Sequence, residues 1–156
     1  MTVGDRGGLK ISVATLMGLG KVSSMPGTLV SAVACFAMLP FCSTLTLVVA
    51  IALTFPLGVW ACDGKPDGAV IDHVTGVWVA MIGHVTPISL GLAVPSLFLF
   101  RVFGLIKPFP VSIAGKLPGG LGIMADDVAA GIVANVILWG IRWMFMGQTP
   151  SFMSVI

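Results

Sequence analysis

The sequence LPGGLGIMADD, Leu117–Asp127, runs directly into the apolar segment Val128–Ile141. Its glycines are Gly119, Gly120 and Gly122. Glycine lets a backbone turn through positive φ and approach a ligand closely. The apolar segment predicts a helix, and a loop that opens a helix points free N–H groups at an anion. At this junction Asp126 and Asp127 are either a helix cap or a pair of ligands for hydrated Mg²⁺, and spacing alone leaves both open.

The composition is that of a membrane protein. Of the 156 residues, 57% are hydrophobic and 9% are charged, and the mean hydropathy is +1.09. Soluble domains carry roughly 25% charged residues. The length predicts a single membrane-embedded domain over residues 1–156, and the net charge of +2 is too small to indicate nucleic-acid binding. The three cysteines lie in apolar runs without C-x-x-C spacing, which favours buried side chains over metal ligands.

Three segments lack Asp, Glu, Lys and Arg, and they predict an all-α integral membrane helical bundle. They are Thr28–Cys62, Val74–Phe100 and Val128–Ile141. As single helices the first two would be about 52 Å and about 40 Å long, well over the ~30 Å hydrocarbon core. Each is therefore expected to form a hairpin, with turns near Pro40–Thr44 and Gly83–Pro87. The third predicts one helix, giving about five helices, several of them short and paired as hairpins.

The loops between these segments carry the charge. They are Met1–Gly27, Asp63–His73 and Arg101–Asp127, and they hold every Asp and seven of the eight basic residues. With two hairpins, all three loops emerge on one face, which the positive-inside tendency makes cytoplasmic. If the second segment were one straight span, the second and third loops could not share a site. The hairpins are therefore a condition for function.

Residues in or directly after these loops suit phosphate or metal binding. They are Gly18, Gly20, Thr28, Asp72, His73, Arg101 and Lys107. Singly, each has an ordinary structural role as a turn glycine, a helix cap or an interfacial side chain. Together on one membrane face, they indicate metal-assisted phosphoryl chemistry on a lipid head group.

Other phosphatase designs lack a required residue. No Cys is followed six residues later by Arg, there is no D-x-D pair, and neither histidine has the basic partners of a phosphohistidine site. Attack by a metal-activated water is the mechanism that remains.

Four blocks of residues carry a family resemblance. They are Gly18, Gly20, Pro26-Gly27-Thr28 and Ser31; Val70, Asp72 and Gly76; Phe100-Arg101, Lys107-Pro108 and Pro110; and Gly119–Met124, Asp126-Asp127, Ala130 and Gly131. In this order they resemble the bacterial phosphatidylglycerophosphatase A family over nearly the whole chain. The resemblance implies a multi-pass, Mg²⁺-dependent phosphatase of the bacterial inner (cytoplasmic) membrane, with its active-site loops facing the cytoplasm. Its substrate, phosphatidylglycerophosphate, would lose the terminal phosphate to give phosphatidylglycerol.

The chain departs from the family pattern at three acids. The family usually has Glu where His73 stands, Asp where Gly104 stands, and an Asp-Pro pair that is Lys65-Pro66 here. Imidazole suits Mn²⁺, Fe²⁺ or Zn²⁺ better than Mg²⁺. Either His73 acts as ligand or base with a changed metal preference, or the metal site is weakened.

The leading hypothesis is therefore a metal-dependent phospholipid phosphatase. Its catalytic residues are Asp72, His73 and Asp127; its metal ligands are Asp72, Asp126 and Asp127; its substrate-binding residues are Gly18, Gly20, Thr28, Arg101, Lys107, Gly119, Gly120 and Gly122. One alternative is a catalytically impaired family member that binds anionic lipid or a partner protein through the same basic face. Another is a small transporter or channel component, in which His84 and Asn135 would face the bundle interior. Asn135 is equally suited to an interhelical hydrogen bond.

Overall fold

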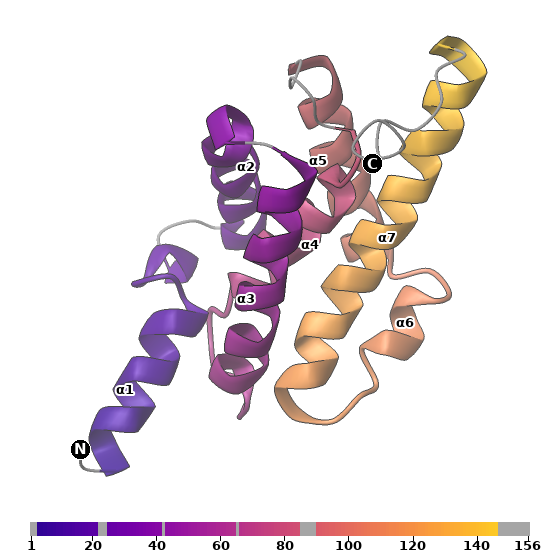
Figure 1. The fold of residues 1–156 in the computed structure, drawn as a ribbon. Coiled ribbons are helices and arrows are strands. Elements are labelled where there is room, and N and C mark those ends of the chain that lie inside the picture. Colours follow the sequence, from indigo (N-terminus) through magenta and orange to yellow (C-terminus); the bar gives the residue numbers. More distant parts are fainter. Residues whose placement is uncertain (1–2, 22–24, 42, 65, 85–89, 147–156) are drawn as a thin grey trace.

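The protein is helical throughout the residues that the computed structural model describes, which are 3–21, 25–41, 43–64, 66–84 and 90–146 (Figure 1). The helices are α1 (Val3–Ala14), η1 (Leu19–Lys21), α2 (Pro26–Met38), η2 (Leu39–Phe41), α3 (Thr44–Cys62), α4 (Ile71–Met81), α5 (Leu90–Ile106), α6 (Val111–Ala114) and α7 (Gly119–Met146). These ranges contain no strand, which confirms the all-α prediction. The apolar segments form α2 to α5 and α7, whereas α1 and α6 come from the polar loops.

Both expected hairpins are present. The first turns at η2, between α2 and α3, and the second turns between the end of α4 at Met81 and the start of α5 at Leu90. Pro87, which was expected to help this second turn, lies outside the described residues. The starts of α2, α4 and α7 and the end of α5 consequently lie on one side of the molecule (Figure 1). The polar loops can therefore contribute to one shared site, for which the two hairpins were the expected condition.

The start of α7 corrects one expectation. The glycine-rich stretch is not a loop capped by Asp126 or Asp127, because α7 begins at Gly119 and both aspartates lie roughly two turns inside it. A Cβ on Gly120 would collide with the carbonyl oxygen of Val59 on α3. Glycine thus lets the first turn of α7 pack directly on α3, so the helix starts earlier than the charge pattern indicated. Similarly, the N-cap of α2 is Met25, so Thr28 is not a cap.

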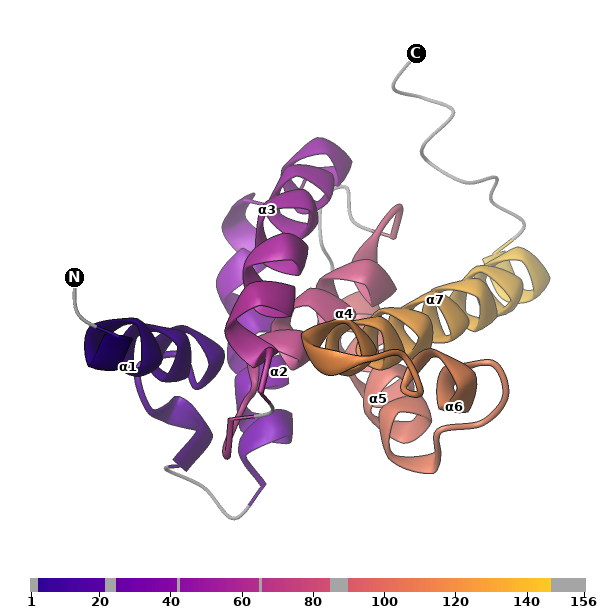
Figure 2. The same cartoon turned by 90° about the horizontal axis from the view of Figure 1, so that it is seen from below.

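The central helix is α4, which packs against α2, α3, α5 and α7 (Figure 2). Its side chains Val74 and Val77 are buried, together with Phe100 of α5. Where α4 crosses α7, a Cβ on Gly131 would collide with the carbonyl oxygen of Gly76. Glycine at this crossing brings the two backbones close together. The crossing fixes which residues of α7 lie beside the start of α4.

A side chain of α7 also holds the far end of α4. The Asn135 Nδ2 amide lies 2.8 Å from the Ile82 carbonyl oxygen and 3.1 Å from those of Val79 and Ala80. It donates to carbonyls at the C-terminal end of α4, of which that of Val79 also accepts from the Ile82 N–H. The interhelical hydrogen bond considered for Asn135 is therefore present. The Asn135 amide binds carbonyl groups at the end of α4, as a residue with a structural role does, and not as a residue that lines a transport pathway.

Within the part of the chain that the structure describes, two helices are long and apolar enough to cross a membrane, judged by length and composition: Thr44–Cys62 and Gly119–Met144. Only 22% of the apolar window in α3 is buried inside the protein. Its side chains Leu45 and Leu53 are 72% and 67% exposed. A large apolar surface of this kind is characteristic of contact with a membrane or a partner protein. By contrast, α4 has 11 residues and is too short for a span.

Candidate metal and phosphate site

Asp72, His73 and Asp127 form a cluster where the first turn of α4 meets α7. One potential ligand atom from each residue lies within 4.8 Å of the other two. Asp72 and His73 are the second and third residues of α4, and Asp127 is placed beside them by the close crossing of α4 and α7. The structure thus brings together the three side chains expected to be catalytic. We call them the Asp-His-Asp cluster.

His73 is held by Asp127 on one side and faces Gly27 on the other. Its Nδ1 contacts Oδ2 of Asp127. Burial acts to lower the pKa of His73, but the hydrogen bond to Asp127 and the charges of Asp72 and Asp127 outweigh burial and raise the pKa. The other ring nitrogen, Nε2, faces Gly27 of α2, where a Cβ would collide with it. Gly27 therefore leaves the space that the His73 ring occupies.

The donor atoms of the cluster fit a divalent cation. Asp72 is 7% exposed, and its Oδ1 has no hydrogen-bond partner among the described residues. Burial, followed by the negative charge of Asp127, raises the pKa of Asp72 to about 7. A buried carboxylate oxygen without a partner is costly, and a bound cation would remove that cost. Two carboxylates with one imidazole suit Mn²⁺, Fe²⁺ or Zn²⁺ at least as well as Mg²⁺.

Asp126 points away from the cluster. Consecutive helical residues are rotated by about 100°, so Asp126 and Asp127 do not share a face. The Asp126 carboxylate pairs with Nζ of Lys107, and this hydrogen-bonded pair raises the pKa of Lys107. The three expected metal ligands are therefore not all together. Asp126 instead holds Lys107, the expected phosphate-binding lysine, near the site.

A pocket of about 320 Å³ opens beside His73. It is lined by Met25, Pro26, Gly27, Thr28, His73, Arg101 and Leu105. A Cβ on Gly27 would lie 3.2 Å from Nη1 of Arg101, so the guanidinium and the His73 ring flank the same glycine. The buried Nε of Arg101 has no partner among the described residues. A guanidinium with a donor to spare is suited to the oxygens of a phosphate group. We call this the phosphate pocket.

The glycines that were predicted to bind substrate do not line the phosphate pocket. Gly18 is a turn residue with φ of 94°. A Cβ on Gly20 would collide with the carbonyl oxygen of Gly68, so Gly20 serves close packing there. The glycines that begin α7 are likewise turn or packing positions, as described for Gly120. Gly27 was not assigned a role from the sequence, although its Pro-Gly-Thr motif belongs to the first family block.

One of the missing acids maps directly onto the site. A Cβ on Gly104 of α5 would lie 3.9 Å from Oδ1 of Asp127. A carboxylate at this position would therefore add a negative group beside the Asp-His-Asp cluster, and this chain lacks it. Lys65, the second such position, lies outside the described residues.

Comparisons with known proteins show the family to which the chain belongs. The family model for phosphatidylglycerophosphatase A matches residues 12–142. Phosphatidylglycerophosphatase A of Haemophilus influenzae is 33% identical over 147 residues, which cover 85% of this chain and 88% of that protein. The Escherichia coli protein of the same name is 29% identical over 147 residues, covering 84% of this chain and 83% of that protein.

A third relative carries a different name. A Bacteroides thetaiotaomicron protein, provisionally named a phosphatidylinositol-3-phosphatase, is 29% identical over 153 residues, covering 87% of this chain and 95% of that protein. No solved structure matches the chain. The match to the family model extends over most of the sequence, from the end of α1 to the last turns of α7, and the chain belongs to the phosphatidylglycerophosphatase A family.

Proposed function

We propose that this protein is a membrane phosphatase that hydrolyses the terminal phosphate of phosphatidylglycerophosphate to give phosphatidylglycerol, with the help of a divalent cation. The observation that carries the proposal is the position of the Asp-His-Asp cluster beside a pocket that contains Arg101. Relatives in the family are named for this substrate. The pocket and the cluster supply the phosphate-binding and acid–base groups that such a hydrolysis needs.

Arg101 binds the terminal phosphate in this proposal. Its guanidinium stays charged at physiological pH and presents donors in a geometry that matches phosphate oxygens. Its effect is largest in the transition state, where negative charge spreads over the phosphoryl oxygens. Lys107, held by Asp126, adds a second positive charge close to the cluster.

His73 moves a proton at Nε2. Because Asp127 engages Nδ1, the ring is fixed with Nε2 toward the start of α2 and the phosphate pocket. Nε2 accepts a proton from the water that attacks phosphorus, the phosphorus–oxygen bond to glycerol breaks, and the leaving oxygen takes a proton from solvent water, while His73 later returns its proton to solvent. Inorganic phosphate and the free hydroxyl of phosphatidylglycerol are the products.

Asp72 and Asp127, with His73 as a third ligand when it is not carrying the proton, would hold the divalent cation. A cation at this place supplies Lewis-acid stabilisation of the phosphoryl oxygens and activates water. The imidazole favours Mn²⁺ or another transition metal over the Mg²⁺ that the family resemblance implies.

The proposal places residues 1–156 as one multi-pass domain in the bacterial inner membrane. α3 and α7 cross the bilayer, because they have the length and apolar surface for it. The site lies at the cytoplasmic face, where the basic loops gather.

The test is the release of inorganic phosphate by purified protein in detergent micelles. Phosphatidylglycerophosphate, phosphatidylinositol 3-phosphate and phosphatidic acid would be compared at equal surface concentration. We expect the highest kcat/KM with phosphatidylglycerophosphate. A higher value with phosphatidylinositol 3-phosphate would overturn the substrate assignment.

A second candidate function is non-catalytic binding of anionic lipid, and the absence of an acid at Gly104 beside Asp127 favours it. Folded protein that binds phosphatidylglycerophosphate but releases no phosphate with any divalent cation would establish that function.

A further inference from the structure

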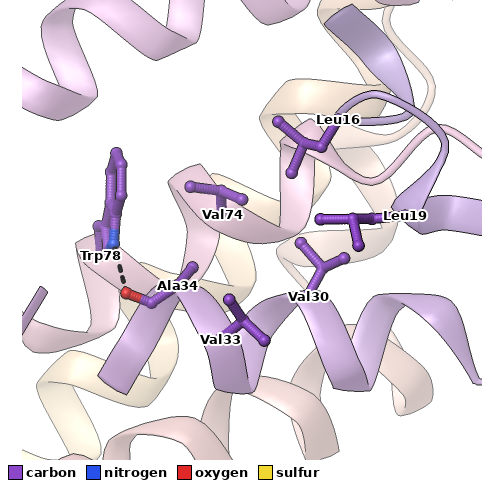
Figure 3. A pocket seen from close by; sticks show the side chains of 7 residues that line it. All are labelled: Leu16, Leu19, Val30, Val33, Ala34, Val74 and Trp78. Carbon is purple, nitrogen blue, oxygen red and sulfur yellow. Dashed lines mark hydrogen bonds between the residues drawn. The ribbon is translucent and has the colours of Figure 1, made fainter. Parts of the chain in front are cut away.

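Two apolar hollows lie next to the phosphate pocket. One, of about 210 Å³, lies among α2, α4 and the segment that ends in η1, and Figure 3 shows the side chains around it. The other, of about 360 Å³, lies among α1, α3 and α4. Leu16, Val74 and Trp78 line both hollows, so the two adjoin each other and are treated together as one groove. We call it the Trp78 groove, lined by Leu16, Val30, Val33, Leu57, Val74 and Trp78.

The groove starts beside the phosphate pocket and leads away from it. On α2, Val30 lies about one turn after Gly27, which lines the pocket. On α4, Val74 directly follows His73 and points about 100° round the helix from it, and Trp78 lies about one turn farther along than Val74. Both helices begin at the site, so successive lining residues lie at increasing distance from the phosphate. This is the direction in which the chains of a bound phospholipid would extend from a phosphate held at the membrane surface.

The lining is almost entirely apolar, and apart from Ser12 its polar side chains are Trp78 and Thr54. Trp78 contributes its indole ring, and its Nε1–H donates to the Ala34 carbonyl oxygen at 3.1 Å (Figure 3). The Thr54 hydroxyl, which lines the second hollow, donates to the Ala50 carbonyl oxygen at 2.8 Å. The polar atoms of both side chains are engaged within the protein. Only the carbon atoms of these two side chains are left to contact a ligand in the groove. Such a surface suits a hydrocarbon chain and does not suit a polar head group.

We propose that the Trp78 groove binds an acyl chain of the phospholipid substrate while the terminal phosphate occupies the phosphate pocket. This inference rests on the proposed function, because it assigns the two ends of one substrate molecule to two adjoining parts of the protein. The charged pocket takes the phosphate, and the apolar groove takes the chain. Binding of the chain fixes the depth and direction from which the head group reaches Arg101 and His73.

A matched pair of substitutions tests the groove through activity. Val33 lines the groove and is 53% exposed, whereas Val49 of α3 does not line it and is 49% exposed. Val33→Trp fills the groove with an indole ring, and Val49→Trp places the same ring on the outer face of α3. We expect Val33→Trp to lower kcat/KM at least tenfold for long-chain phosphatidylglycerophosphate. For the deacylated head group, which has no chain, kcat/KM should stay within twofold, and Val49→Trp should change neither value. Equal losses on both substrates, or none on the long-chain lipid, would overturn the proposal.

Photolabelling tests the same inference without turnover. Wild-type protein would be labelled with phosphatidic acid that carries a diazirine in its acyl chain, and with phosphatidylcholine that carries the same chain. We expect labelling of Leu16 and Val33 to be several-fold stronger with phosphatidic acid, because its phosphomonoester anchors in the pocket. Equal labelling by both lipids would show that bulk lipid fills the groove and would overturn the inference. If wild-type protein released no phosphate, the proposed function would fail while this labelling still reported on the groove.

Discussion

His73 on α4 and Asp127 on α7 are 54 residues apart in the sequence, and their side chains meet through Nδ1 and Oδ2. This contact joins the start of a short central helix to a position about two turns inside α7, the longest described helix. It depends on the glycine crossing of α4 and α7, which leaves no room for side chains between the two backbones. The arrangement gives one carboxylate two tasks, since Asp127 both orients His73 and contributes to the donor set with Asp72.

Asp127→Asn should weaken metal binding and abolish most activity. The amide keeps the size of the side chain but removes the charge that a cation and the His73 ring both use. We expect at least a hundredfold lower kcat and at least tenfold weaker binding of Mn²⁺, followed by electron paramagnetic resonance. Asp63→Asn is the matched control, because the Asp63 side chain is exposed and pairs with Lys10. Equal Mn²⁺ affinity in the wild type and in Asp127→Asn would remove Asp127 from the metal site.

His73→Glu should shift the metal preference toward Mg²⁺. It replaces a nitrogen donor with the oxygen donor that the family usually has at this position. We expect the ratio of the rate with Mg²⁺ to the rate with Mn²⁺ to rise at least fivefold. His73→Ala, which removes both donor and proton carrier, should lower kcat about a hundredfold with either ion. An unchanged ratio in His73→Glu would mean that residue 73 does not contact the metal.

Gly27→Ala should impair activity although it favours the helix. Alanine has a higher helix propensity than glycine, although Gly27 is only the second residue of α2 and not in the helix interior. At Gly27, however, the added Cβ would collide with Nε2 of His73, so we expect kcat to fall at least tenfold. Gly140→Ala is the control, since no atom lies within 4 Å of a Cβ there. Full activity in Gly27→Ala would show that the His73 ring can move without consequence.

Asp126→Asn should act on phosphate binding and leave metal binding unchanged. The substitution removes the charge that holds Lys107, so KM should rise several-fold while Mn²⁺ affinity stays within twofold of wild type. Lys107→Met should raise KM in the same way. If Asp126→Asn weakened Mn²⁺ binding as strongly as Asp127→Asn, Asp126 would be a ligand after all.

Asn135→Leu should destabilise the fold more than it affects the chemistry. It removes the Asn135 amide from the carbonyl groups of Val79, Ala80 and Ile82, of which that of Val79 keeps a backbone donor, the Ile82 N–H. A buried group deprived of its hydrogen bond costs about 1–3 kcal/mol. The measurement is the unfolding free energy in mixed micelles, with Val136→Leu as control because Val136 is exposed on the next position of α7. Equal stability of the two variants would contradict a capping role for Asn135.

The sequence has the composition of a membrane protein, and it was sufficient to predict the two hairpins and the position of the polar loops on one side of the molecule. Segment length decided the hairpins, because Thr28–Cys62 and Val74–Phe100 exceed one bilayer span as single helices. The start of α7 could not be predicted in this way. Turn propensity of glycine pointed to a loop at Gly119–Gly122, whereas close packing of Gly120 on α3 makes this segment helical.

The different contacts of Asp126 and Asp127 also could not be predicted from the sequence. Two adjacent acids suggested a shared metal, and in a loop they could have shared one. Inside a helix the two side chains point in different directions, so the Asp127 carboxylate contacts His73 and the Asp126 carboxylate pairs with Lys107. The role of Gly27 could not be derived either, since it depends on the distance between the start of α2 and the first turn of α4.

The central claim is that a divalent cation held by the Asp-His-Asp cluster drives phosphate release. The most direct test removes all metal from the purified protein and then adds Mn²⁺, Mg²⁺ or Zn²⁺ singly, with phosphatidylglycerophosphate as substrate. We expect no release before addition, the fastest release with Mn²⁺ or Zn²⁺, and at least a hundredfold lower rate in Asp127→Asn. Undiminished release from metal-free protein, or full metal-dependent activity in Asp127→Asn, would contradict this account.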